Sequence, residues 1–145
     1  MKENLKSVES LKELLADQFV IYTKLLNYHW NVNGINFYRL HSLFEQLYSE
    51  LAEEIDEIAE RIKILGYVAP GSLQEFLALS KVKESNQYPI EDTQMVKDII
   101  ADYEYLKLKI ESIIENKTDI VSEGMLVSIL EKYEKHVWMM KSTVK

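Results

Sequence analysis

The feature of this sequence that most constrains its fold is one long, regular stripe of apolar residues between Phe37 and Leu65. Its members are three or four residues apart, which is the spacing that places side chains along one side of an α-helix. A stripe of about seven turns must be buried against other helices. It consists of Leu40, Phe44, Leu47, Leu51, Ile55, Ile58, Ile62 and Leu65. Gly66 follows directly and favours the end of the helix there.

Three other segments have the same spacing and are also predicted to be helices. The first covers residues 5–29 and ends near 31–34, because the Asn and Gly residues there tolerate positive φ angles. The apolar residues of the other two helices extend over 96–113 and 126–140. Four long amphipathic helices in a chain of this length predict an all-α four-helix bundle, formed as a single domain over residues 1–145.

The connection between the second and third helices, residues 67–89, is long and has a different composition. It contains Pro70-Gly71 and then Ser72 and Glu75, which have the spacing of a helix capping box. A short helix is therefore expected inside this connection. A segment of this length can return along the whole bundle, so the second and third helices are expected to be joined by a crossover.

Composition and charge narrow the classes of function. The 145 residues include no cysteine, which excludes disulfides, thiolate metal sites and cysteine nucleophiles. The formal net charge of −7 disfavours a general nucleic-acid binder and suits a protein that attracts cations. We find no signal-peptide pattern at the N-terminus and no run of about 18 apolar residues. We therefore expect a cytoplasmic protein that does not enter a membrane.

A group of polar residues flanks the apolar stripe and has the composition of a metal site. His41, Glu45 and Asp56 each follow a stripe residue by one position, about 100° around the helix, so they are expected to point away from their own bundle core. Glu60 lies one turn after Asp56. His29 belongs to the first helix, and a hairpin centred near residue 35 would place it at the same depth as His41.

Distance indicates that these donors cannot all belong to one chain. His41 and Asp56 are fifteen residues apart, or about 22 Å along a straight helix. A second copy packed antiparallel about a twofold axis near residues 50–51 would bring His41 and Glu45 opposite Asp56 and Glu60 of its partner. Two imidazoles and three carboxylates suit Fe(II), Mn or Zn. The spacing therefore suggests an interface as well as a site.

Simpler interpretations of the same residues remain open. A histidine on a half-buried helix is often a hydrogen-bonded structural residue. Asp56 and Glu60 also fit a solvated acidic helix face. Trp30 and Tyr48 fit ordinary packing positions in a core or an interface.

The sequence resembles the Dps family, the mini-ferritins also called starvation-inducible DNA-protection proteins. The resemblance is carried by HWNVNG at 29–34, Leu40-His41, Asp56 and AERI at 59–62. It continues through LQEFL and KVKE to KHVWM at 135–139, and so covers nearly the whole chain. It implies a ferritin-like four-helix bundle with a short helix in the crossover, assembled as a hollow homo-dodecamer.

The same resemblance implies a function. Ferroxidase centres would lie at the twofold interfaces, with metal ligands and catalytic residues His29, His41 and Glu45 from one subunit and Asp56 and Glu60 from its mate. The centre would oxidise Fe(II) to Fe(III), preferably with hydrogen peroxide or else with O2, and ferric mineral would be stored in the cavity. This iron storage would protect against oxidative stress. Zn²⁺ is a possible substitute for iron. Trp30 and Trp138 would lie near the centre and quench radicals.

Two departures from the family pattern affect these expectations. Many members carry Asp at the position of Glu45, which leaves the occupancy of a second iron position open. Several DNA-binding members have a long lysine-rich N-terminal tail, whereas residues 1–10 here contain only Lys2 and Lys6, offset by Glu3 and Glu9. Phosphate contacts drive non-specific DNA binding, so DNA binding is expected to be weak or absent.

Other roles of the acidic residues, and other functions, stay open. By family analogy Asp119 and Glu123 are candidates for an iron-entry pore, and the alternative is an ordinary role at a helix N-terminus. Glu50, Glu53, Glu54 and Glu57 are candidates for lining the cavity. A monomeric di-iron oxidase or conventional ferritin would place Glu-x-x-His pairs on facing helices, and this sequence has none. A non-catalytic nucleoid or surface-binding protein and a purely helical scaffold are the remaining classes.

Overall fold

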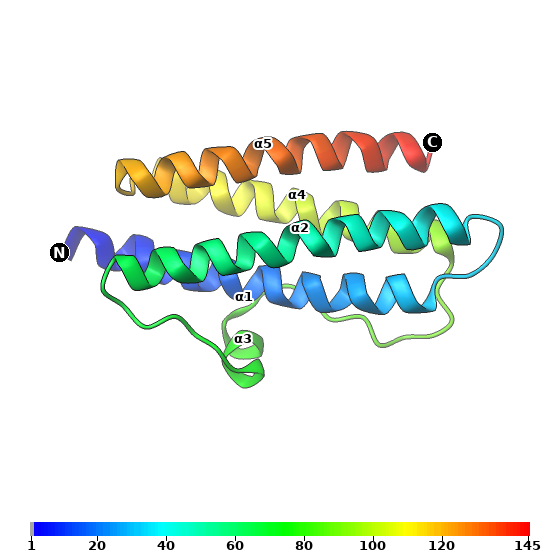
Figure 1. Ribbon diagram of the computed structural model, residues 1–145, viewed down its shortest axis with the longest axis horizontal. Helices are drawn as coiled ribbons and strands as arrows, with labels where there is room; N and C mark the ends of the chain where they lie inside the picture. Colours follow the sequence, from blue (N-terminus) through cyan, green and yellow to red (C-terminus); the bar gives the residue numbers. More distant parts are fainter. Residues whose placement is uncertain (1) are drawn as a thin grey trace.

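The protein folds into five helices arranged as a four-helix bundle with a short fifth helix on its side (Figure 1). The computed structural model describes residues 2–145, with side chains from Leu5 onward. The helices are α1 (Lys2–Asn31), α2 (Phe37–Ile64), α3 (Leu73–Leu79), α4 (Asp92–Glu115) and α5 (Ile120–Thr143). No strand occurs within these residues. The predicted all-α class, the four long helices and the short extra helix are confirmed.

The connections follow from the chain's turn residues. Helices α1 and α2 form an antiparallel hairpin whose turn contains Gly34 at a φ of 104°, and α2 ends just before Gly66 at a φ of 93°. Both angles are in the region that favours glycine. Helices α4 and α5 form a second hairpin. The chain between α2 and α4 crosses from one end of the bundle to the other, with α3 about midway (Figure 1).

The predicted capping box starts α3. Ser72 Oγ accepts a hydrogen bond from the backbone N–H of Glu75 at 3.2 Å, and the Ser72 hydroxyl donates to Glu75 Oε1 at 2.8 Å. Phe76 then turns its ring onto Phe19 of α1, with ring centroids 4.5 Å apart. The short helix is therefore both capped and packed against the bundle.

One buried carboxylate holds the crossover against two long helices. Asp17 of α1 is almost completely buried. It accepts hydrogen bonds from Ser80 Oγ, from the backbone N–H of Lys81 and from Tyr105 OH, all between 2.8 and 2.9 Å. These three donors satisfy the buried charge and connect α1, the end of α3 and α4.

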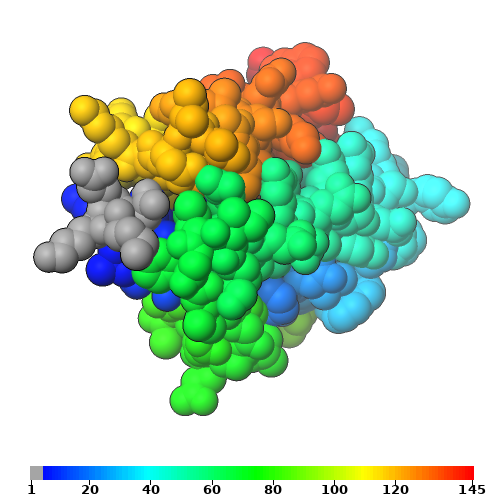
Figure 2. All heavy atoms as spheres, turned by 60° about the vertical axis from the view of Figure 1, so that its left-hand side comes forward, coloured from blue at the N-terminus to red at the C-terminus, as the bar shows by residue number. Residues whose placement is uncertain are grey.

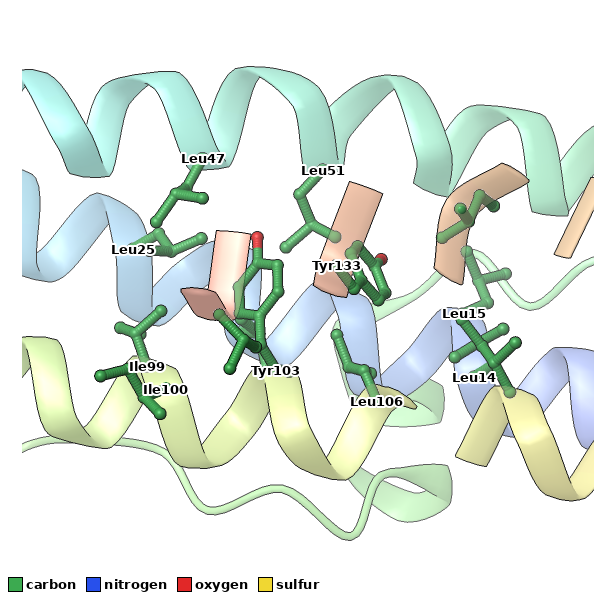
Figure 3. Packing of buried hydrophobic residues seen from close by; sticks show 14 of the residues in the cluster. Leu14, Leu15, Leu25, Leu47, Leu51, Ile99, Ile100, Tyr103, Leu106 and Tyr133 are labelled. Atoms are coloured by element: carbon green, nitrogen blue, oxygen red, sulfur yellow. The ribbon is translucent and has the colours of Figure 1, made fainter. Parts of the chain in front are cut away.

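The buried stripe of α2 matches the prediction with one exception. Leu40, Phe44, Leu47, Leu51, Ile58 and Ile62 are buried, and Ile55 and Leu65 are partly buried. The core also contains Tyr103 and Tyr133, which lie among leucines and isoleucines of the surrounding helices (Figure 3). Glu54, however, occupies an inward position of α2 and is only 2% exposed.

The expectation that Glu54 could line a cavity is therefore wrong. Its Oε1 accepts a hydrogen bond of 2.6 Å from Tyr133 OH, which itself accepts one of 2.9 Å from Gln18 Nε2. Burial in the core raises the pKa of Glu54 from 4.5 to about 7, although the hydrogen bond from Tyr133 opposes the shift. The tyrosine hydroxyl allows this carboxyl to replace an apolar residue in the stripe.

The expectations about membrane insertion and DNA binding can also be compared with the structure. Among the described helices, none is both long enough and apolar enough to cross a membrane. The expectation of weak DNA binding relies partly on Lys2 and Glu3, whose side chains lie outside the described part of the chain.

Replacing Asp17 by alanine should destabilise the protein by about 2–3 kcal/mol, because buried donors on the crossover and on Tyr105 lose their acceptor. Urea unfolding at a fixed protein concentration measures the change. Glu9→Ala is the matched control on the same helix, since Glu9 makes only an exposed ion pair with Lys12; it should change stability by no more than about 0.5 kcal/mol. Equal losses for the two variants would contradict the anchoring role.

Glu54 should make stability depend on pH. Its raised pKa means that the folded state retains a proton that the unfolded state releases, so stability should fall as pH rises from about 4.5 to about 7. Glu54→Gln removes the charge and keeps an oxygen acceptor for Tyr133. The variant should show a smaller fall and be more stable at pH 8 by as much as about 3 kcal/mol. Unfolding measured from pH 5 to 8 tests this, with the exposed Glu53→Gln as control.

Candidate metal centre

Two histidines meet where α1 ends and α2 begins. His29 lies in the last turn of α1 and His41 in the second turn of α2, and their rings are stacked with centroids 3.7 Å apart and planes 14° from parallel. His29 Nδ1 is 2.8 Å from the backbone oxygen of His41, and His41 Nδ1 is 2.6 Å from the backbone oxygen of His29. The expected equal depth of the two residues is confirmed.

These reciprocal contacts determine which ring nitrogens are available to a ligand. A carbonyl oxygen can only accept, so each Nδ1 must carry the proton and donate. In the neutral imidazole the other nitrogen, Nε2, then has a free lone pair. Backbone carbonyls that orient histidines in this way are typical partners of metal-binding imidazoles. The contact from His41 also supplies a partner for a carbonyl in the last turn of α1, where intrahelical partners are missing.

Glu45 completes a three-residue group. It follows His41 by one turn of α2, and its Oε1 lies 3.8 Å from His29 Nε2. One donor atom from each of His29, His41 and Glu45 lies within 4.8 Å of the others. His29 is buried, His41 is half-buried and Glu45 is exposed, so the group opens to solvent on the side of the carboxylate.

Two aromatic residues hold the imidazoles from the sides. Phe37 stacks on His41 with centroids 4.9 Å apart, and the ring of Tyr48 meets His29 edge-on at 5.2 Å. These supports were not predicted, although Tyr48 follows His41 by seven residues and so lies on the same side of α2. The sequence interpretation of Tyr48 as a packing residue agrees with this contact.

Asp56 and Glu60 form a separate acidic pair farther along α2. Both are exposed, and a hydrogen bond with Asp56 together with its negative charge raises the pKa of the Glu60 carboxyl. Within one chain the helix length keeps Asp56 about 22 Å from His41. The structure therefore assembles three of the five predicted ligands and leaves the other two apart. Figure 2 shows α2 as an open surface between α5 and the crossover.

The other residues singled out in the sequence are placed as follows. Trp30 and Trp138 are mostly exposed, at 67% and 65%. Asp119 is the N-cap of α5, where it accepts hydrogen bonds from Ser122 and pairs with Arg61 at 2.5 Å. Burial acts to raise the pKa of Asp119, but these contacts together outweigh it and lower the pKa to about 2. The contacts of Asp119 are therefore those of an ordinary helix N-cap. Glu123 lies half-buried in the first turn of α5.

The three-residue group has the donor atoms of a metal site. Two neutral imidazole nitrogens and one carboxylate oxygen are a donor set suited to Fe(II), Mn(II) or Zn(II). Three protein donors leave coordination positions free, and the open side of the group is where further ligands, water or an oxidant can bind.

The protonation of the two histidines can be tested directly. In the metal-free protein, ¹⁵N NMR of histidine-labelled protein should show that the neutral rings of His29 and His41 carry their proton at Nδ1. The chain contains only three histidines, so the variants His29→Ala and His41→Ala assign the signals. A neutral ring with its proton on Nε2 and none on Nδ1 would contradict the carbonyl contacts described above.

Comparison with known proteins gives a consistent result. Residues 8–145 match the family model of the ferritin-like domain. DNA protection during starvation protein 2 of Bacillus anthracis is 37% identical over 142 residues, which cover 96% of this chain and 97% of that protein. The crystal structure of Dps from Staphylococcus aureus has a TM-score of 0.93 and 39% identity, covering 98% of this chain and 97% of that one.

A solved structure with lower sequence identity is described by the superfamily to which that protein belongs. The DPS protein from Vibrio cholerae O1 is described as a member of a broad superfamily of ferritin-like diiron-carboxylate proteins. It has a TM-score of 0.95 and 28% identity, and the match covers 99% of this chain and 92% of that one.

Proposed function

This chain belongs to the Dps family of ferritin-like proteins, and we propose that it oxidises Fe(II) to Fe(III) and stores the ferric product. The observation that carries the proposal is the group formed by His29, His41 and Glu45, in which both free imidazole nitrogens lie beside an exposed carboxylate. Iron is here the substrate, and the two histidines and the carboxylates are its ligands.

The complete centre would form between two copies of the chain. An antiparallel pairing of α2 helices about a twofold axis places Asp56 and Glu60 of one copy opposite His29, His41 and Glu45 of the other. The open surface of α2 and the exposure of the acidic pair support this arrangement. Six such pairs would build a hollow homo-dodecamer of twelve chains, as the family resemblance implies, with the mineral inside.

The charges of the centre favour oxidation. Three carboxylates beside two neutral imidazoles stabilise Fe(III) more than Fe(II), because the interaction grows with the charge of the ion. With hydrogen peroxide as oxidant, two Fe(II) ions each give one electron, two protons are taken up from solvent, the O–O bond breaks and two water molecules form. Consuming peroxide and Fe(II) together removes both reactants that generate hydroxyl radicals. This is the proposed protection against oxidative stress in the cytoplasm.

The first test compares single variants in peroxide-driven iron oxidation. His41→Ala and Asp56→Ala should each slow the early absorbance increase after addition of Fe(II) by about tenfold or more, because each removes a ligand of every centre. Glu53→Gln, an exposed carboxylate on the same helix, is the control and should oxidise iron normally. If the His41 and Asp56 variants retained full activity, the assigned centre would be wrong.

A mixing experiment tests whether the centre is shared. Subunits with His41→Ala and subunits with Asp56→Ala are denatured together and reassembled in equal amounts. In a mixed pair, one of the two centres receives only intact ligands, so about a quarter of all centres should recover activity. A centre contained in one chain would recover none, because every chain carries one defect. Reassembly of each variant alone is the control.

The acidic character of the chain supports weak DNA binding or none. A gel-shift assay at neutral pH and physiological salt should show no stable complex, because the formal net charge is −7 and residues 1–10 carry only two lysines for phosphate contacts. A positive control is a variant carrying a lysine-rich N-terminal extension. A salt-sensitive complex formed by the unmodified protein would contradict the expectation.

The arrangement of polar groups disfavours an iron centre inside one bundle. Such centres need several carboxylate and histidine donors from facing helices. Among the described residues, the only close group of three such donors is the one containing His29, His41 and Glu45. Zn²⁺ would be expected to compete with Fe(II) there, because imidazole and carboxylate ligands suit both ions.

A further inference from the structure

The turn between α1 and α2 contains the one asparagine of the chain that is followed directly by glycine. Asn33 and Gly34 lie within residues 32–36, and both are exposed. Such a pair is the least hindered setting for attack of a backbone nitrogen on a side-chain amide, because glycine has no Cβ to obstruct the approach. Asparagine is one of the residues that limit the chemical durability of proteins. The pair is therefore a candidate site of modification.

The groups that would react are free of hydrogen bonds. The carboxamide of Asn33 makes none with the described residues, and the Gly34 N–H has no acceptor among them. The other asparagines of this region differ, since the carboxamides of Asn27, Asn31 and Asn36 all donate hydrogen bonds. A free carboxamide can turn toward the next backbone nitrogen, whereas a bonded one is held in place.

The turn also leaves room for a ring between the two residues. No atom lies within 4 Å of the position that a Cβ of Gly34 would occupy. The main chain on either side is held, because the Val32 N–H donates to the Tyr28 oxygen at 3.0 Å and the Phe37 N–H donates to the Gly34 oxygen at 3.1 Å. A change at Asn33 is therefore confined to the tip of the hairpin and does not require the helices to move.

We propose that Asn33 is a site of spontaneous deamidation in the native protein. The backbone nitrogen of Gly34 attacks Cγ of Asn33, a five-membered succinimide ring forms, and the side-chain nitrogen leaves as ammonia with the proton lost from the backbone amide. Water then opens the ring at one of its two carbonyl carbons. Opening at one carbon gives aspartate, and opening at the other gives iso-aspartate, in which the main chain runs through Cβ and Cγ. The net reaction consumes one water and releases one ammonia.

The product changes the charge of the hairpin tip. Each converted chain gains one carboxylate beyond the formal net charge of −7, in the turn that joins the helices carrying His29 and His41. Water does not restore the lost ammonia, so a long-lived copy retains the added charge. Deamidation neither uses nor removes a proposed metal ligand, and its test is therefore independent of the iron-oxidation assays.

The test follows the full-length, assembled protein in mildly alkaline buffer over time. Peptides obtained by digestion at acidic pH, where deamidation is slow, are analysed by mass spectrometry with fragmentation. Asn33 should gain one dalton about tenfold or more faster than Asn86, an exposed crossover asparagine that is followed by glutamine. Methylation by an isoaspartyl methyltransferase should identify iso-aspartate at position 33. The rate should rise with pH, because the Gly34 nitrogen attacks after losing its proton.

Two comparisons test the roles of the ring and of the turn. Asn33→Gln keeps a carboxamide but lengthens the side chain by one methylene, so the five-membered ring cannot form; position 33 should stay unmodified while Asn86 reacts as fast as before. Guanidinium-unfolded protein gives the rate without the turn, and the native rate at Asn33 should be similar to it. Circular dichroism and light scattering establish that the native samples remain folded and assembled. A native rate at Asn33 equal to that at Asn86, or far below the unfolded rate, would overturn the proposal.

Discussion

The rigid length of α2 is the constraint on which the rest of the protein depends. Its 28 residues carry an apolar face that is buried in the bundle and an outer face that carries donor groups at both ends. Each fully buried leucine, isoleucine or phenylalanine of the inner face contributes about 1.5–3 kcal/mol, and together they fix the rotation of the helix about its axis. The outer donors therefore cannot turn inward to meet one another. A straight helix keeps them apart in one chain, so the proposed five-ligand centre requires a second one.

The long helices could be predicted from the sequence because the spacing of apolar residues follows directly from helix geometry. The start of α3 was predictable for an equally local reason, since Ser72 and Glu75 contact each other within one turn. The depth of His29 and His41 followed from a short hairpin. Their stacking and their bonds to each other's carbonyls did not, because these depend on the exact turn and on packing against Phe37 and Tyr48.

The polar residues of the interior were the least predictable part of the chain. Glu54 occurs among other acidic residues that are exposed or half-buried, and only its contact with Tyr133, 79 positions later, explains its burial. Asp17 likewise depends on donors more than 60 positions away. No local pattern distinguishes such a carboxylate from a solvated one, because its partners lie far along the sequence. The acidic pair Asp56 and Glu60 is a related case, since its proposed partners are in another molecule.

The short turn between α1 and α2 fixes the positions of the two histidines relative to each other. It spans only residues 32–36, and each imidazole is bound to the main chain of the opposite helix. One residue inserted in the helical part between either histidine and the turn would rotate that imidazole by about 100° and move it by about 1.5 Å, so both carbonyl contacts would break together. The crossover has no comparable constraint on its length, because Asp17 holds it only at Ser80 and Lys81. Natural variation in chain length should therefore accumulate in the crossover and be excluded from the helical residues between the two histidines and this turn.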